Sequence, residues 1–287
     1  MFSVPAVCIF APLIQFFPVG LGLKMVFISS VFTALLFSYL MPVTLIFKGK
    51  KLLAILLFAV GILFFFHAQS TSRFSSKRQK PNSLVYYQNN DINKAFWLTY
   101  DAQLDSWTAP FFKDGLSNTK KLPILGAGSK YGIRYTYAKN TRPKTLPMFE
   151  VKPHEDTLTL NKKVGFTICP RQGAHQLQLF SEKAHLIDSL KVNGKTAWIK
   201  NPIVPTQKNT LPFLKYWLTP GDSLEVSLST NSQTLPITVL EYSYDLLKTP
   251  GFNLPKRPVH TMPKPFVITD AIIIQQTIDP FQLNPLK

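Results

Sequence analysis

Three apolar stretches fill the first 66 residues, and no acidic residue occurs before Asp91. The stretches cover residues 2–23, 25–47 and 52–66, and from about residue 80 the chain becomes polar and rich in strand patterns. An apolar segment of about 20 residues is long enough to cross a bilayer as a helix. We therefore predict a membrane α plus all-β protein, in which about three transmembrane helices precede an antiparallel β-sandwich-like domain.

We place the transmembrane helices at about residues 3–17, 25–47 and 51–67. The second has 23 residues, and Pro42 lies near its end, where a proline kinks or terminates a helix. The third is shorter, so we expect the flanking lysines to extend toward the interface.

Prolines and glycines interrupt the first stretch, and we expect its helix to end in a turn at residues 17–24. A signal peptide is the alternative interpretation, but the basic start is missing and two further spans follow. The abrupt beginning of this span suggests that the natural chain extends further upstream.

The loop Lys48-Gly49-Lys50-Lys51 is the strongest signal for orientation, because basic loops favour the cytoplasmic side. It places the large domain outside the cytoplasm. The basic residues of 73–80 argue the other way, but long domains translocate largely regardless of their charge. We predict an integral membrane protein with an extracytoplasmic β domain. The lack of Asn-x-Ser/Thr sequons favours a bacterial envelope protein, and thus the periplasmic face.

Residues 68–82 are predicted to form a polar linker, and residues 83–287 a β-sandwich domain with a proline-rich C-terminal tail. Two hairpins are indicated by turn residues that tolerate positive φ, one at residues 89–91 and one at Asn193-Gly194. Apolar residues alternate in 224–228, as in a half-buried strand. The sequence IIIQQ at 272–276 is the expected final strand.

The net charge of +17 raises the question of nucleic acid, but the basic residues of the soluble part are scattered and form no recognisable motif. Residues 81–287 carry 24 basic and all 15 acidic residues. We therefore predict no nucleic-acid partner. The lipid bilayer is the expected partner, and the basic residues of 73–80 suit anionic headgroups beside the membrane.

No arrangement of side chains predicts catalysis. A zinc site needs several converging His and carboxylate ligands, and the five histidines show no such spacing. We interpret His154-Glu155-Asp156 as a solvated loop and His175 as a hydrogen-bonded or rim histidine. The glycine-rich residues 126–130 lack the order of a phosphate loop. We predict no catalytic, cofactor-binding or metal-binding residue in this chain.

The two cysteines, Cys8 and Cys169, lie in different parts of the chain and predict no disulfide. Cys169 is expected to be a small core residue.

Four tryptophans keep a binding function open. Aromatic side chains on a sandwich can stack on sugars, although most tryptophans at such positions belong to the core. They are Trp97, Trp107, Trp198 and Trp217.

Two stretches, residues 80–112 (KPNSLVYYQNNDINKAFWLTYDAQLDSWTAPFF) and 241–274 (EYSYDLLKTPGFNLPKRPVHTMPKPFVITDAIII), resemble a known family. They are similar to the C-terminal region of membrane-bound zinc exopeptidases of metallopeptidase family twenty-eight, such as the endoplasmic-reticulum metallopeptidase and the vacuolar membrane protease. The order of spans before a β-rich region fits the same pattern, over most of residues 25–287.

The resemblance implies a zinc peptidase domain that precedes the membrane spans in the family. None of that domain's ligand positions has a counterpart here, so no zinc ligand or catalytic residue is carried over. The predicted function is a non-catalytic membrane-anchoring and β-sandwich C-terminal part of such a protein, with an upstream or separately encoded peptidase domain as its partner. The alternative is an independent envelope module that binds a glycan or a protein.

Two structural expectations concern single residues. Asp91, Asp101 and Asp105 are expected to form hydrogen-bonded turns beside a packed sheet. Arg257 and Asp270 are expected to pair and to hold down the proline-rich tail, which contributes about 0–1 kcal/mol if the pair is exposed.

Overall fold

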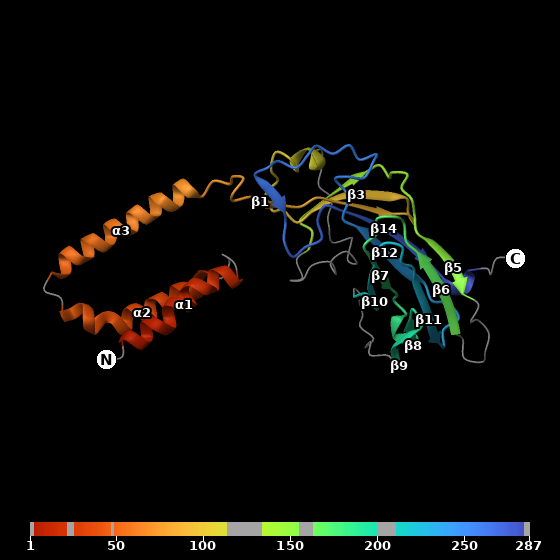
Figure 1. Ribbon diagram of the computed structural model, residues 1–287, viewed down its shortest axis with the longest axis horizontal. Coiled ribbons are helices and arrows are strands. Elements are labelled where there is room, and N and C mark those ends of the chain that lie inside the picture. The colour runs from red at the N-terminus through yellow and green to blue at the C-terminus, as the bar shows by residue number, and fades with distance from the viewer. Residues whose placement is uncertain are drawn as a thin grey trace. The chain divides into compact units, whose positions relative to one another are not determined.

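The computed structural model describes residues 3–21, 26–46, 49–113, 134–154, 163–199 and 211–283. The chain divides into two compact units, Met1–Arg73 and Phe74–Lys287 (Figure 1). The first is helical and the second is rich in β-sheet, which confirms the order of a helical region before a β region.

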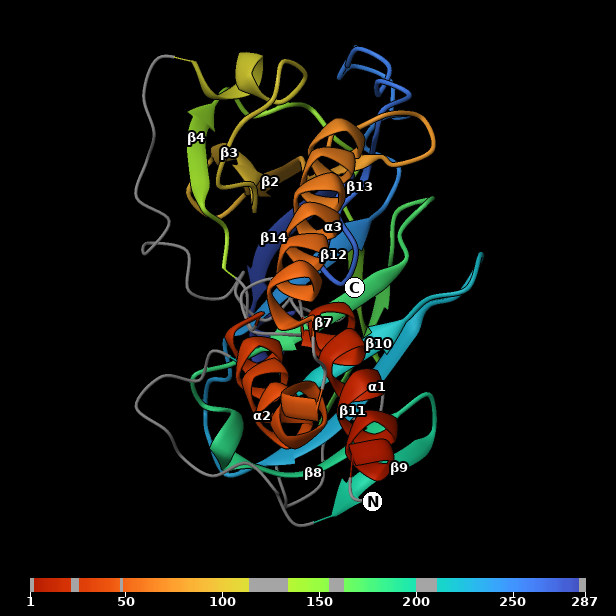
Figure 2. The same ribbon diagram turned by 90° about the vertical axis from the view of Figure 1, so that its left-hand side faces the viewer.

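The helical unit consists of α1 (Ser3–Leu21), α2 (Val26–Ile46) and α3 (Lys50–Thr71). The first two helices lie side by side (Figure 2). The Ser29 hydroxyl donates to the Ile14 carbonyl at 3.0 Å, and Phe32 packs on Phe10 and Phe17 with ring centroids 5.6 and 5.4 Å apart. Helix α1 continues through Pro18 to Leu21, where a turn was expected.

Helix α3 has 22 residues, none of them buried. Among the described residues it is the one helix long and apolar enough to cross a membrane. The apolar parts of α1 and α2 are shorter, Val4–Val19 and Val26–Pro42. Helix α3 also extends to Thr71, so the first four residues of the expected polar linker are helical.

The β unit contains two large sheets and a two-stranded pair. The seven-stranded sheet has the order β10-β7-β12-β14-β2-β3-β4, and the five-stranded sheet the order β5-β6-β11-β8-β9. The strands are β1 (Lys80–Asn82), β2 (Val85–Asn89), β3 (Lys94–Thr99), β4 (Tyr137–Thr141), β5 (Glu150–His154), β6 (Lys163–Cys169), β7 (Gln176–Phe180), β8 (Ile187–Val192), β9 (Lys195–Ile199), β10 (Leu214–Trp217), β11 (Leu224–Thr230), β12 (Ile237–Ser243), β13 (Thr261–Pro263) and β14 (Ala271–Ile278).

The seven-stranded sheet is mixed, so the expectation of purely antiparallel pairing was wrong. Strand β14 pairs antiparallel with β12 but parallel with β2, with Ala271 opposite Val85. Strands β1 and β13 are also parallel. The reason is that the last strand enters the middle of the sheet beside an early strand, which a chain of successive hairpins cannot produce.

Both predicted hairpins are confirmed. Strands β2 and β3 pair around the first turn, where Asn93 has φ 49°. Strands β8 and β9 flank Asn193-Gly194, whose φ values of 49° and 73° suit a type I′ turn. Alternation in β11 is regular, with every second residue buried.

One hydrophobic core contains residues from both large sheets and therefore lies between them. The seven-stranded sheet contributes, among others, Leu177, Leu179 and Val239, and the five-stranded sheet contributes Phe166 and Leu228. A second core lies on the same face of the seven-stranded sheet, near β2. There Tyr86 packs against Trp97 and Phe252. A third core covers the opposite face. Strand β14 is buried over its first five residues because it is covered on both faces.

Candidate functional site

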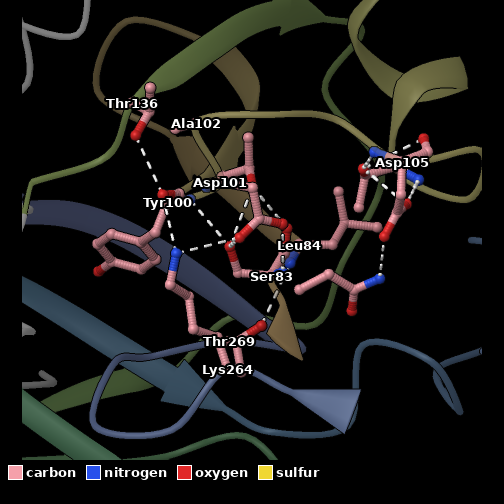
Figure 3. A network of polar contacts seen from close by, with 12 residues as sticks. Ser83, Leu84, Tyr100, Asp101, Ala102, Asp105, Thr136, Lys264 and Thr269 are labelled. Carbon is pink, nitrogen blue, oxygen red and sulfur yellow. Dashed lines mark hydrogen bonds and ion pairs between the residues drawn. The ribbon is translucent and has the colours of Figure 1, made fainter. Parts of the chain in front are cut away.

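Residues from both ends of the β unit meet in a polar junction at the start of β2 (Figure 3). Ser83 comes from the β1–β2 connection, Asp101 follows β3, and Lys264 follows β13. The Leu84 carbonyl accepts from the Asp270 amide at 2.8 Å, and the Thr269 hydroxyl accepts from the Leu84 amide at 3.2 Å. The two stretches that carry the family resemblance, 80–112 and 241–274, are therefore packed against each other.

Asp101 is the centre of this junction and is 6% exposed. Its carboxylate accepts from the Ser83 amide at 2.8 Å, from the Ser83 hydroxyl at 3.1 Å and from the Lys264 ammonium at 3.2 Å. Lys264 also donates to the Tyr100 carbonyl at 3.1 Å. A buried carboxylate with several donors and an opposite charge is a stable structural element.

The Ser83 hydroxyl is fully buried and already bonded, which argues against a nucleophilic role. It accepts from the Tyr100 amide at 2.9 Å and lies 3.0 Å from the Thr99 hydroxyl. A nucleophile needs a neighbouring base and access to the substrate.

Asp105 organises the turn that follows. Its carboxylate accepts from the Asn82 amide group at 2.8 Å and from the backbone amides of Trp107 and Thr108 at 3.0 and 2.8 Å. Burial acts to raise the pKa of this carboxyl, but the hydrogen bonds together outweigh burial and lower the pKa below its ordinary 3.8.

The expected turn is present at Asp91, which lies between β2 and β3 and accepts from the Thr277 amide at 2.8 Å. Asp101 lies outside a turn, and its partners come from segments distant in sequence.

The predicted pair of Arg257 and Asp270 is confirmed. The side chains are 11% and 15% exposed, so the pair is largely buried. The Arg257 guanidinium also lies 4.5 Å from the centroid of the Trp107 ring, whose Nε1 donates to the Pro255 carbonyl at 3.0 Å. Burial raises the pKa of Asp270, and Arg257 opposes that rise. The pair connects the chain before β13 to the start of β14.

A second buried ion pair was not anticipated from the sequence. Arg171 Nε donates to Glu241 Oε1 at 2.7 Å, the Arg171 amide donates to Oε2 at 3.1 Å, and Arg171 also bonds to Ser243. Burial raises the pKa of Glu241, against the effect of Arg171. No local signal would have revealed this pair, because its members are 70 residues apart.

A group of tyrosines and glutamines occupies the face of the seven-stranded sheet opposite the inter-sheet core. The rings of Tyr100 and Tyr135 are stacked with centroids 4.1 Å apart, and Tyr242 donates to Gln178 at 3.3 Å. Among the described residues, the Nε2 atoms of Gln176 and Gln178 are buried without a hydrogen-bond partner. Burial raises the pKa of Tyr100 to about 12. Unpaired buried polar atoms are rare in folded proteins.

Three of the four tryptophans belong to packed regions. Trp107 is buried, Trp97 packs against Phe111 at 5.0 Å, and Trp198 packs on the inter-sheet core. Trp217, in edge strand β10, is 60% exposed, and the Lys215 ammonium lies 5.3 Å from its ring centroid. Trp217 is directly opposite Gln176 in the sheet, so both side chains lie on the same face.

The remaining sequence candidates do not assemble into a site among the described residues. His175 is an exposed histidine whose Nδ1 accepts from the Tyr244 amide at 3.4 Å, as predicted for a hydrogen-bonded position. Cys169 is free and half-buried at the end of β6, so its assignment to the core was wrong. Phe166 and Ile168 point into the inter-sheet core, so the alternation along β6 places Cys169 on the opposite face of the strand. Residues 126–130 and 155–156 lie outside the described residues.

In the described ranges no three His, Cys, Asp or Glu side chains are placed to hold a metal ion. No protein-family model, curated protein or solved structure matches the chain.

Proposed function

We propose that this chain is a membrane-tethered, non-catalytic scaffold: helices anchor it in the bilayer, and an extracytoplasmic β-sandwich holds a partner domain at the membrane face. The observation that carries the proposal is α3, a 22-residue apolar helix with no buried residue that leads directly into the β unit. Exposed apolar side chains along a whole helix are stable in lipid rather than in water.

The three-span arrangement is part of the proposal. Helices α1 and α2 are apolar, and several of their hydroxyls donate to helix carbonyls, as Thr33 does to the Ser29 carbonyl at 2.7 Å. Such internal bonds satisfy polar groups that lipid cannot. The short apolar lengths of these two helices can be accommodated by local thinning of the bilayer.

The proposed partner is a zinc exopeptidase domain of family twenty-eight, encoded upstream or separately. The resemblance of residues 80–112 and 241–274 supports this partner, as does the way in which both stretches form one junction around Asp101 and Arg257. In this proposal the zinc and the catalytic residues belong to the partner domain, and the role of the present chain is to orient that domain.

Two experiments test the proposal. Alkaline extraction of membranes that contain the chain is expected to leave it in the pellet; release into the supernatant would refute the anchor. Reading the DNA upstream of Met1 tests the link to peptidases. A peptidase coding sequence there supports it, and an unrelated gene with no peptidase nearby counts against it.

A second candidate, an envelope module that binds glycan, is favoured by Trp217. Its ring is 60% exposed in edge strand β10, and the Lys215 ammonium lies 5.3 Å from the ring centroid. An exposed aromatic face beside a hydrogen-bond donor suits a sugar. Titration of the detergent-solubilised chain with cell-wall sugars should change tryptophan fluorescence, and Trp217→Phe should abolish the change. A flat response in the unaltered chain ends this candidate.

A further inference from the structure

The connection between α3 and the β unit is short. Helix α3 ends at Thr71 and β1 begins at Lys80, nine residues later. Nine extended residues reach at most about 30 Å. The backbone bonds between Ser75 and Arg78, at 3.0 and 3.1 Å, fold part of this connection back on itself. If α3 spans the bilayer, as proposed above, β1 is held near the membrane surface.

A second segment, distant in sequence, is fixed to this connection. Gln79 Nε2 donates to the Val259 carbonyl at 2.8 Å, and the Lys80 amide donates to the His260 carbonyl at 2.8 Å. Further on, the Lys264 amide donates to the Asn82 carbonyl at 2.9 Å. These hydrogen bonds fix the loop of residues 256–266 to β1, so the loop lies as near to the membrane surface as β1 does. We call the exposed side chains of residues 74–80 and 256–266 the tether face.

The tether face exposes large apolar side chains. Phe74 is 55% exposed, Val259 is 73% exposed and Phe266 is 61% exposed. Phe266 has φ 63°, a backbone conformation that a bulky residue rarely adopts and that costs free energy. Exposure of three large apolar side chains to water is unfavourable, and transfer of such side chains into the headgroup region of a membrane is favourable.

The charge of these segments has one sign. Residues 74–80 and 256–266 contain six basic residues and no acidic residue. Arg257 and Lys264 are paired with Asp270 and Asp101. Lys77 and Lys256 are exposed in the same two segments as the apolar side chains. Apolar rings among lysines are the combination that favours the headgroup region of an anionic membrane.

We propose that the tether face docks on the anionic bilayer surface, with Phe74, Val259 and Phe266 among the headgroups and the lysines on acidic lipid. Docking would fix the β unit against the membrane rather than leave it to swing on its connection. The inference depends on the proposed transmembrane placement of α3. Near an anionic surface, each basic residue should change the ratio of docked to undocked domains about fivefold.

The test uses the full chain in nanodiscs of phosphatidylcholine, with or without phosphatidylglycerol. In a Cys8→Ala, Cys169→Ala background, a spin label is placed at His260→Cys in the tether face. Reference labels are placed at Val60→Cys in α3 and at Gln233→Cys in the β11–β12 connection. Docking predicts that the His260 label becomes accessible to oxygen and protected from a water-soluble nickel reagent when anionic lipid is present, while the Gln233 label stays accessible to nickel.

Variants separate docking from folding. Phe266→Gly accepts the positive φ and removes the ring, so it should keep the melting temperature yet reduce the protection of the His260 label. The double variant Lys77→Gln, Lys256→Gln should reduce the protection of the His260 label in anionic discs only.

The outcomes distinguish the two proposals. A nickel-accessible label at Val60 would refute the transmembrane placement itself. A lipid-protected Val60 label with a nickel-accessible His260 label in both kinds of disc would refute docking and leave the anchor intact. Equal protection with and without anionic lipid would refute the proposed lipid specificity.

Discussion

Buried charges in the β unit have partners of opposite charge. Among the described residues, the buried charged residues are Asp101, Arg171 and Glu241. Asp101 pairs with Lys264, and Arg171 pairs with Glu241. A buried pair adds little over apolar replacements, but removal of one partner leaves an isolated buried charge. These pairs therefore specify which segments meet more than they stabilise the fold.

Arg171→Ala tests this view. Loss of the guanidinium leaves the Glu241 carboxylate buried and unpaired, so the free energy of unfolding should fall by about 3–5 kcal/mol. Burial already raises the Glu241 pKa above its ordinary 4.5. A carboxyl with a raised folded pKa is most favourable below its ordinary pKa and loses that contribution as pH rises through the folded pKa. The defect should therefore shrink as pH falls, in urea unfolding followed by near-UV circular dichroism.

The control replaces both members, as Arg171→Met with Glu241→Leu. This variant should lose less stability than Arg171→Ala because no charge is left unpaired. If both variants lose the same free energy of unfolding at every pH, an unpaired buried Glu241 carboxylate is not the cause of the loss.

Asp105→Asn should show the opposite dependence on pH. The hydrogen bonds lower the Asp105 pKa below 3.8, so its ionised form adds stability above that pH and loses it as pH falls through the lower folded value. At neutral pH we expect a loss of about 1–3 kcal/mol. The wild-type advantage should vanish in acid, as measured by thermal unfolding between neutral and acidic pH. Asp188→Asn, an exposed position in β8, serves as the matched control and should have little effect.

Among the secondary-structure elements, the two hairpins could be predicted from their turn residues. The pairing of strands that are distant in sequence could not be predicted. Asn193-Gly194 specifies its turn by itself, because both residues tolerate positive φ. The parallel pairing of β14 with β2 joins residues 271–275 to 85–89, and nothing in either strand encodes the other's position. Continuous burial in β12 and β14 also removes the alternation that helps to align a strand.

The turn between β8 and β9 can be used to test whether residues that tolerate positive φ specify the hairpin. Gly194→Ala should lower the free energy of unfolding by about 1–2 kcal/mol, because alanine is disfavoured in the left-handed region. No atom lies within 4 Å of the added methyl group, so the loss would report backbone strain alone. Gly61→Ala in α3, also in open space, should leave the unfolding of the β unit unchanged. Equal effects of the two substitutions would contradict the explanation.

Helix α3 provides a second test at this scale. Val60→Arg places a charge in the middle of the proposed span, at a cost of about 2.5–3.5 kcal/mol for insertion. Because α1 and α2 would still hold the chain in the membrane, the readout is the side on which the β unit lies. Labelling of Gln233→Cys by a membrane-impermeant maleimide in intact cells should fall in the arginine variant and stay unchanged in the matched control Val60→Leu. Unchanged labelling of the arginine variant would indicate that α3 does not cross the bilayer.

For the whole molecule, the order of parts could be predicted from composition, since the apolar stretches end at residue 66 and every acidic residue follows, from Asp91 on. Less of the candidate site could be predicted from the sequence. The Arg257–Asp270 pair was expected from the sequence, but the packing of residues 80–112 against 241–274 around Asp101 was not. Tertiary proximity also produced the group of Tyr100, Gln176 and their neighbours, which no sequence pattern indicated.

We propose that the helical unit crosses the membrane and carries the β unit outside the cytoplasm. Single cysteines at Val60 and Gln233, in the chain without its native cysteines, test this placement in intact cells with a membrane-impermeant maleimide. We expect that Gln233→Cys is labelled in intact cells and that Val60→Cys is not labelled before or after lysis. Labelling of Gln233→Cys only after lysis, or of Val60→Cys in unlysed or lysed cells, would contradict it.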